Sequence, residues 1–159
     1  MIKLNAANLK QLPANVARPG YDRAKVRPGI VHFGVGGFHR AHHAMYLDRL
    51  MNDGQAMEWG ICGVGLLPRD QAMRDALSSQ DGLYTLVVKH ADGHGEARVI
   101  GSIIEYLYAP DDPSRVVEKL AAPETRIISL TITEGGYNYR QDTGEFDFDE
   151  PSVDLHLDG

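Results

Sequence analysis

A pair of glycines after a short apolar run is the first feature of the sequence that could do chemistry. Residues 29–42 read GIVHFGVGGFHRAH, in which Gly34 and Gly36 follow a run that ends at Phe33. Main-chain N–H groups bind diphosphates, and a glycine lets the ligand approach because it has no Cβ. A helix that begins after such a turn adds the partial positive charge of its amino end. The pattern predicts either a dinucleotide-binding turn at Gly34, Gly36 and Gly37 or an ordinary strand-to-helix turn with a glycine cap.

The third glycine position of the G-x-G-x-x-G pattern is occupied by His39. The usual glycine lets the helix pack closely on the strand, so a histidine predicts either wider packing or a ring directed toward the ligand. Arg40 beside it would add side-chain cover. His39, His42 and His43 also share one helical face. The H-E-x-x-H pattern is absent and no third ligand is apparent, so no metal site is expected.

An acid after the second strand would bind the adenosine ribose of a dinucleotide. Glu58 has about the usual spacing from the glycines, but it precedes the predicted strand 59–64, whereas Asp70 follows that strand's carboxyl end. We therefore choose Asp70, with the alternative that it only complements the dipole of the helix that starts there. Arg69 could accept the 2′-phosphate of NADP, so we expect NAD to bind more tightly, with some binding of NADP.

The segment SLTITEGGY, residues 129–137, ends the last predicted strand with polar side chains. Thr133 and Glu134 would lie at the carboxyl edge of the sheet, where ligands bind in open α/β folds. Glu134 either contacts the ribose or nicotinamide or is a strand-end carboxylate in water. We expect His32 to be a hydrogen-bonded core histidine and Cys62 to be a small buried hydrophobe.

Strands and helices alternate along the chain, which predicts the framework that positions these residues. The order predicts an α/β, Rossmann-like fold with a mostly parallel sheet, helices on both faces and an inserted antiparallel hairpin that turns at Asp92 and Gly93. Residues 1–28 would form a leading arm, 29–137 the dinucleotide-binding domain, and 138–159 an acidic loop or connection. The predicted strands are 30–34, 59–64, 84–90, 96–104 and 126–133, and the predicted helices are 6–11, 38–52, 68–80 and 113–121.

The composition of the 159 residues, with 43% hydrophobic and 24% charged, is typical of a soluble globular domain. Seven of the 22 acidic residues lie within 137–159, and no cationic stretch suggests a nucleic-acid partner. No apolar run approaches the ~20 residues that span a bilayer, and the amino terminus lacks a secretory signal pattern. The single cysteine excludes an internal disulfide. We therefore expect a cytoplasmic protein with neither a membrane nor a nucleic-acid partner.

Five segments together resemble one family, the long-chain polyol dehydrogenases. They are GVGGFHRAH (34–42), WGICGVGLLPRD (59–70), QDGLYTL (80–86), RVIGSI (98–103) and SLTITEGGY (129–137). The similarity is nearly continuous from Lys3 to Tyr137. The family carries a histidine at the third glycine position, which favours the nucleotide site. The resemblance implies that Asp70 binds the adenosine ribose, that Thr133 and Glu134 approach the nicotinamide, and that the pyrophosphate is lined by Gly34, Gly36, Gly37, Phe38, His39 and Arg40.

The resemblance also implies an activity, the metal-independent interconversion of mannitol and fructose by hydride transfer with NAD. In the family a lysine takes the hydroxyl proton, and it lies in a K-x-x-x-x-N-x-x-H arrangement within a mostly helical second domain. No segment of this sequence matches that arrangement. We therefore expect a cofactor domain whose partners are a small polyol or ketose and a catalytic domain outside these residues. The alternatives are a uronate reductase, an arabinitol dehydrogenase or a non-catalytic nucleotide-binding module.

Overall fold

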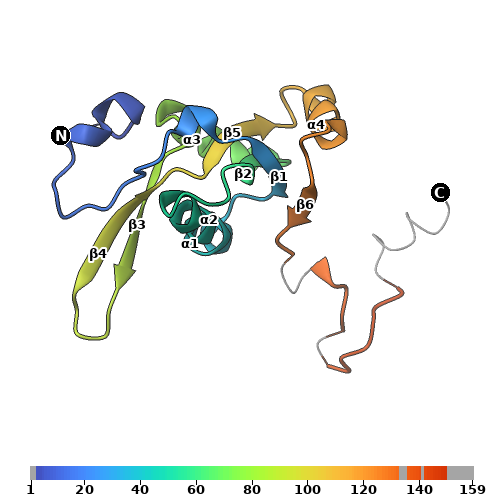
Figure 1. The fold of residues 1–159 in the computed structure, drawn as a ribbon. Helices are drawn as coiled ribbons and strands as arrows, with labels where there is room; N and C mark the ends of the chain where they lie inside the picture. The colour runs from blue at the N-terminus through green and yellow to red at the C-terminus, as the bar shows by residue number, and fades with distance from the viewer. Residues whose placement is uncertain (1–2, 133–135, 141, 150–159) are drawn as a thin grey trace.

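A sheet of four parallel strands lies at the centre of the computed structural model, which describes residues 3–132, 136–140 and 142–149 (Figure 1). Its order is β5-β2-β1-β6, and each neighbouring pair is parallel. The strands are β1 (Pro28–Phe33), β2 (Gly60–Gly65), β5 (Ile103–Tyr108) and β6 (Ile127–Leu130). Because parallel strands share one direction, their carboxyl ends meet at one edge of the sheet.

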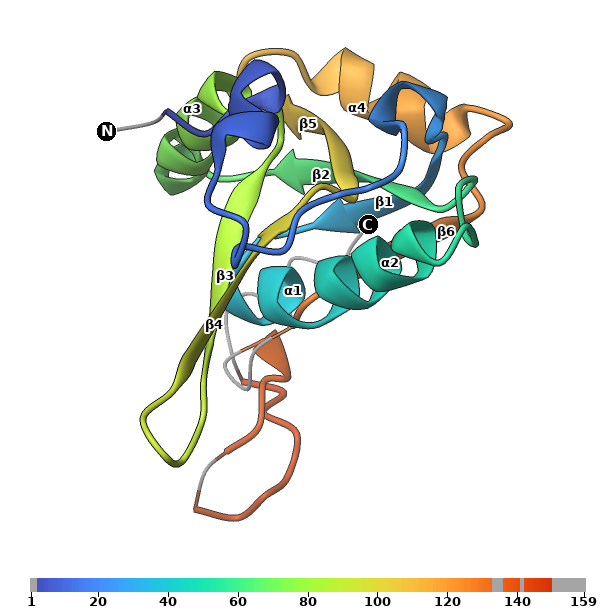
Figure 2. The same cartoon turned by 60° about the vertical axis from the view of Figure 1, so that its left-hand side comes forward.

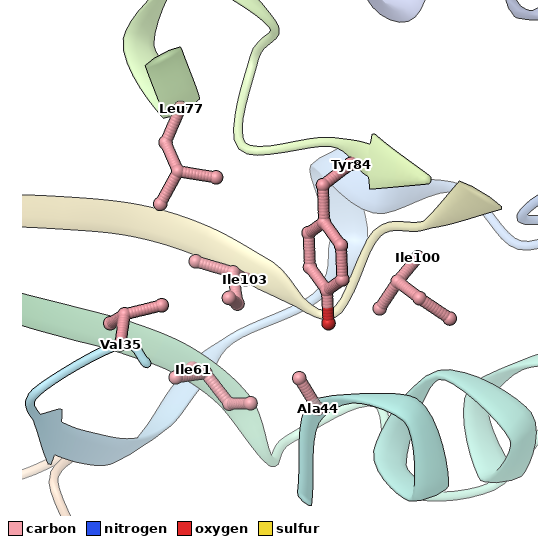
Figure 3. Close-up of a cluster of buried hydrophobic side chains, with 7 residues drawn as sticks. All are labelled: Val35, Ala44, Ile61, Leu77, Tyr84, Ile100 and Ile103. Atoms are coloured by element: carbon pink, nitrogen blue, oxygen red, sulfur yellow. The ribbon is translucent and has the colours of Figure 1, made fainter. Parts of the chain in front are cut away.

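Helices cover both faces of this sheet, as the alternating pattern predicts (Figure 2). On one face, Val35 and the sheet residues Ile61 and Ile103 pack against Ala44 and Leu77, which come from two different helices (Figure 3). These helices are α2 (His43–Asn52) and α3 (Gln71–Ser79). On the other face α4 (Pro113–Ala121) contributes Val116 to a second cluster with Val31, Cys62, Val64 and Leu107. Strands buried on both faces read as continuous apolar runs, which explains the sequence of β2.

The predicted hairpin is present, but its second strand is shorter than expected. β3 (Tyr84–Lys89) and β4 (Gly95–Ile100) pair antiparallel and project from the body of the molecule (Figures 1 and 2). The prediction of one strand over 96–104 is wrong, because the chain bends at Gly101 and Ser102 and then enters the parallel sheet as β5. Arg23 holds the bend by donating to the carbonyl oxygens of Gly101 at 2.9 Å and Ile103 at 3.0 Å.

The predicted helix over 38–52 is two helices, α1 (Gly37–Ala41) and α2, which meet at His42. His42 has φ −121° and ψ −82°, outside the helical region. The break exposes the Arg40 carbonyl, which accepts a 2.6 Å hydrogen bond from the hydroxyl of Tyr84 on β3. The periodicity of the sequence did not predict this break, and the hydrogen bond that accompanies it comes from a residue distant along the chain.

The remaining elements are short. The predicted helix over 6–11 is a 3-10 helix, and two further 3-10 turns occupy Arg23–Lys25 and Pro68–Asp70. The leading arm lies against the body, since Ala17 forms a bridge with Arg98 and the Tyr21 hydroxyl donates to Asp48 at 2.7 Å. Among the described residues, no helix has both the length and the apolar character needed to cross a bilayer.

Candidate functional site

The turn after β1 has a glycine where the backbone demands one. Gly34 adopts φ +82°, a region that side chains strongly disfavour. Its N–H donates to the carbonyl of Val64 on β2 at 3.0 Å, and the N–H of Gly36 donates back to the Gly34 carbonyl at 2.8 Å. These bonds fix the turn at the carboxyl edge of the sheet, between its two central strands.

Open space lies in front of the same turn. A Cβ placed on Gly34 or Gly37 would meet no protein atom within 4 Å, and one on Gly36 would meet only the Gly34 carbonyl oxygen at 4.0 Å. Gly36 has an ordinary φ of −81° and gives α1 no side-chain cap, so the N–H groups of the first turn have no helical partner. Neither packing nor backbone strain explains glycine at Gly36 and Gly37. The arrangement fits a diphosphate that approaches the bare main chain.

His39 points inward, away from this open face. Its side chain is 1% exposed, and its ring stacks on His32 of β1 with the centroids 3.6 Å apart and the planes 11° from parallel. Burial lowers the pKa of His39 to about 3 and that of His32 to about 4, so both rings are neutral at pH 7. His39 therefore fills the helix–strand contact, where the usual pattern has a glycine, and only its main chain faces the turn.

His32 is the hydrogen-bonded core histidine that the sequence predicts. It is fully buried, with Nδ1 2.9 Å from Ser129 Oγ and Nε2 3.2 Å from Thr131 Oγ1. His39 differs, because neither of its ring nitrogens has a hydrogen-bond partner among the described residues. Buried polar atoms are rarely left in this state.

Phe38 and Arg40 flank the open face of the turn. The Phe38 side chain is 58% exposed and stacks on the ring of His42 at 4.5 Å between centroids. Arg40 donates through Nε to the Gly36 carbonyl at 3.3 Å, and its guanidinium lies 5.7 Å from the ring centre of Tyr84. Both residues can therefore contact a ligand that binds at the turn.

Asp70 lies just past the carboxyl end of β2, at the same sheet edge as the glycine turn. Its Oδ2 accepts from the N–H groups of Leu66 at 2.9 Å and Leu67 at 3.0 Å, and it makes no capping bond to α3. Oδ1 has no hydrogen bond within the described part of the chain, so it is available to a ribose hydroxyl. Arg69 is exposed beside it. Thr133 and Glu134, the remaining predicted site residues, lie outside the described residues.

The sequence analysis missed the residues that support the site from behind. A Cβ on Gly63 would lie 2.5 Å from Val35 Cγ2, and one on Gly65 would lie 2.4 Å from the Tyr106 hydroxyl and 2.8 Å from Asp70 Cβ. Alternate glycines in the buried strand GICGVG were the available signal, because a glycine inside a strand marks a close approach.

Comparison of the sequence and structure with known proteins assigns the chain to a family. The sequence model of a family described as the mannitol dehydrogenase Rossmann domain matches residues 28–150. The chain belongs to the mannitol dehydrogenase family. The match spans the glycine turn, Asp70 and the last strand of the sheet, and the resemblance identified from the sequence motifs is confirmed.

Individual members of the mannitol dehydrogenase family support the assignment. Mannitol 2-dehydrogenase of Aspergillus niger is 53% identical over 99% of this chain and 33% of its own length. A solved structure of Pseudomonas fluorescens mannitol 2-dehydrogenase, a ternary complex with NAD and D-mannitol, is 50% identical, with a TM-score of 0.87 over 99% of this chain and 32% of that one. A D-sorbitol dehydrogenase structure is 43% identical with a TM-score of 0.82. The chain thus spans about a third of the length of these relatives.

Proposed function

We propose that residues 29–137 are the NAD-binding part of an oxidoreductase that interconverts mannitol and fructose by hydride transfer. The proposal extends to this chain what its relatives are named for, namely a mannitol 2-dehydrogenase at 53% identity and one solved with NAD and D-mannitol at 50% identity. No metal takes part in the proposed hydride transfer.

In this proposal each part of the sheet edge binds one part of the dinucleotide. The free N–H groups after Gly36 bind the diphosphate, and Arg40 adds a positive charge at the rim of the turn. Phe38 covers the ligand from the solvent side. Asp70 keeps Oδ2 on the loop N–H groups and accepts a ribose hydroxyl at Oδ1. Thr133 and Glu134, which come after β6 in the sequence, are proposed to meet the nicotinamide end.

NAD, when bound, supplies the acceptor for the hydride that leaves the carbinol carbon of the polyol. The chain itself positions this acceptor and provides no proton acceptor of the K-x-x-x-x-N-x-x-H type. We therefore expect these residues to bind NAD and to leave mannitol unoxidised. The curated relatives are about three times as long as this chain, so we propose that the proton acceptor belongs to a segment outside these residues.

The observation that carries the proposal is the open space at Gly36 and Gly37, which the fold does not otherwise need. Titration calorimetry with NAD tests it on three proteins: the wild-type chain, Gly37→Val, and Gly95→Val as a control in the hairpin. The Gly37→Val side chain would occupy the ligand space, so we expect the Kd for NAD to rise more than about tenfold while Tm changes little. Gly95→Val should bind like wild type, because a Cβ there meets only Val87 at 3.8 Å.

Two results would contradict the proposal: a wild-type chain that does not bind NAD, or a Gly37→Val chain that binds it unchanged.

A second candidate is an oxidoreductase for another polyol, which the similarity to D-sorbitol dehydrogenase favours. Steady-state rates of a polypeptide that joins these residues to a catalytic segment, measured with mannitol, sorbitol and arabinitol and, in the reverse direction, with fructose and uronates, distinguish the substrates. Binding of NAD with no turnover of any of them would indicate a non-catalytic nucleotide-binding module.

A further inference from the structure

Three histidines from different elements meet beneath the glycine turn. His32 lies in β1, His39 in α1 and His43 at the start of α2, and one nitrogen from each lies within 4.8 Å of the other two. We propose that these three side chains form a binding site for a divalent transition metal, with Zn²⁺ as the representative ion. The site is separate from the proposed hydride transfer, which needs no metal.

His39 is the strongest indication of a ligand. It is 1% exposed, yet neither ring nitrogen has a hydrogen-bond partner among the described residues. A buried imidazole in this state has lost its hydration without gaining a hydrogen bond in exchange, which is unfavourable. Coordination through one nitrogen would recover part of that loss. The ring can also reorient without breaking any hydrogen bond.

His32 has the surroundings of a metal ligand. Its Nδ1 is held by Ser129 Oγ at 2.9 Å, whereas its Nε2 has the longer contact, 3.2 Å to Thr131 Oγ1. Histidine ligands typically bind the metal through one nitrogen while the other donates to a fixed oxygen. In the site proposed here Ser129 would be that oxygen, and Nε2 would leave Thr131 for the ion.

The stacked rings of His32 and His39 must separate before both can bind one metal ion. Planes 11° from parallel, with centroids 3.6 Å apart, cannot direct two in-plane lone pairs at an ion about 2 Å from each nitrogen. His39 must therefore tilt out of the stack. His43 already stands nearly perpendicular to both rings, at 90° to His32 and 87° to His39, and it is exposed, so the ion can enter from its side.

The donor set determines the class of ion. Three neutral imidazoles without a carboxylate suit Zn²⁺, Cu²⁺, Ni²⁺ and Co²⁺, and they disfavour Mg²⁺ and Ca²⁺, which prefer oxygen. Three protein ligands leave a fourth tetrahedral position for water. His39 and His43 also line an apolar cavity of about 330 Å³ between α2, β1 and β6, which leaves room for the tilted ring.

The test uses the chain with Zn²⁺ and Co²⁺ added as the free ions. We expect one Zn²⁺ per chain in competition with a chelating indicator, and Co²⁺ absorption bands typical of tetrahedral nitrogen ligands. His43→Gln should weaken Zn²⁺ binding by about tenfold or more. His42→Gln is the matched control, because His42 is an exposed neighbour whose Nδ1 lies 3.0 Å from the Phe38 carbonyl and it is not part of the cluster. A His90→Gln, His94→Gln double variant controls for the exposed pair in the hairpin.

Three results would overturn the site: no stoichiometric Zn²⁺ binding, equal affinity in wild type and His43→Gln, or loss of binding in the hairpin double variant instead. Circular dichroism checks that each variant is folded, and exposed His43 makes its replacement mild. NAD titration of the same variants keeps the two proposals apart. A variant that loses Zn²⁺ binding but binds NAD normally supports the metal site and leaves the proposed function unchanged. A wild-type chain that binds Zn²⁺ but not NAD contradicts the proposed function and leaves the metal site unchanged.

Discussion

Val35, in the middle of the glycine turn, packs directly on Gly63 of β2, where a Cβ would lie 2.5 Å from Val35 Cγ2 and 3.1 Å from the Tyr106 ring. Val35 is almost fully buried and belongs to the cluster with Ile61 and Ile103 (Figure 3). The turn that is proposed to bind a diphosphate is therefore anchored in the core through one side chain. Its position depends on the absence of a side chain on the neighbouring strand.

Gly63→Ala tests this anchor. The added methyl group would push Val35 off the sheet, so we expect a loss of about 1–3 kcal/mol in the free energy of unfolding and weaker NAD binding. Urea unfolding and calorimetry measure the two effects. Gly95→Ala is the control, since its Cβ would make only an ordinary contact at 3.8 Å. Equal stability of Gly63→Ala and wild type would show that Val35 can move freely.

Asp70 and Arg69 should set the preference between NAD and NADP. Asp70→Asn replaces the carboxylate that would accept a hydrogen bond from a ribose hydroxyl with a neutral amide. A hydrogen bond to a charged group contributes ~1.5–3 kcal/mol, so we expect the Kd for NAD to rise about tenfold. Arg69→Ala should weaken NADP binding and spare NAD, because the exposed guanidinium would meet only the 2′-phosphate. Glu58→Gln, at the opposite end of β2, should change neither constant. Tighter NADP than NAD binding in the wild type would contradict this assignment.

Asp48 joins the leading arm to the body of the molecule, and we expect its replacement to destabilise the fold. It is fully buried on α2 and accepts hydrogen bonds from the Tyr21 hydroxyl at 2.7 Å and the Gly101 N–H at 2.9 Å, with Arg98 3.9 Å away. Burial raises the pKa of this carboxyl. Asp48→Ala leaves these donors unpaired, so we expect a loss of about 3 kcal/mol in the free energy of unfolding. Asp48→Asn should lose less, and equal losses in urea unfolding would show that the hydrogen bonds contribute little.

The exposed apolar side chains of β6 should make the chain associate with other copies of itself. β6 is an edge strand of the sheet, and its Ile128 and Leu130 side chains are 55% and 59% exposed. Exposed apolar edge strands promote self-association. We expect light scattering to show a mass that rises with concentration, and Ile128→Lys to suppress the rise. Val87→Lys in the hairpin, at a position 53% exposed, is the control. A monomer at all concentrations would contradict this prediction.

Cys62 should be unreactive in the folded chain. It is fully buried in β2, and burial raises the pKa of its thiol to about 12. A pKa above the ordinary value means that the folded state disfavours the thiolate, which is the reactive form. We expect a thiol reagent at pH 8 to label the native chain far more slowly than the urea-unfolded chain. Rapid labelling of the native chain would show that β2 opens.

Local signals in the sequence predict most of the framework. Apolar β-branched runs predict the parallel strands, Asp112 followed by Pro113 predicts the start of α4, and Asp92 with Gly93 predicts the hairpin. The position of Gly34 between a strand and a helix predicts a tight turn there, and the structure adds that its φ is positive. These features depend on a few neighbouring residues, and short-range sterics and burial periodicity are sufficient to set them.

Contacts between distant residues set the rest. Tyr84 donates to the carbonyl freed by the break at His42, and Arg23 donates to the bend after Ile100. Val35 of the turn packs where Gly63 has no side chain. The sequence places His39 in the third glycine position and His32 in a strand, but only packing brings their rings to 3.6 Å. Periodicity reports which face of an element is buried and carries no information about which residue it meets there. The partner depends on how the strands and helices are arranged in space, and that arrangement exists only in the folded chain.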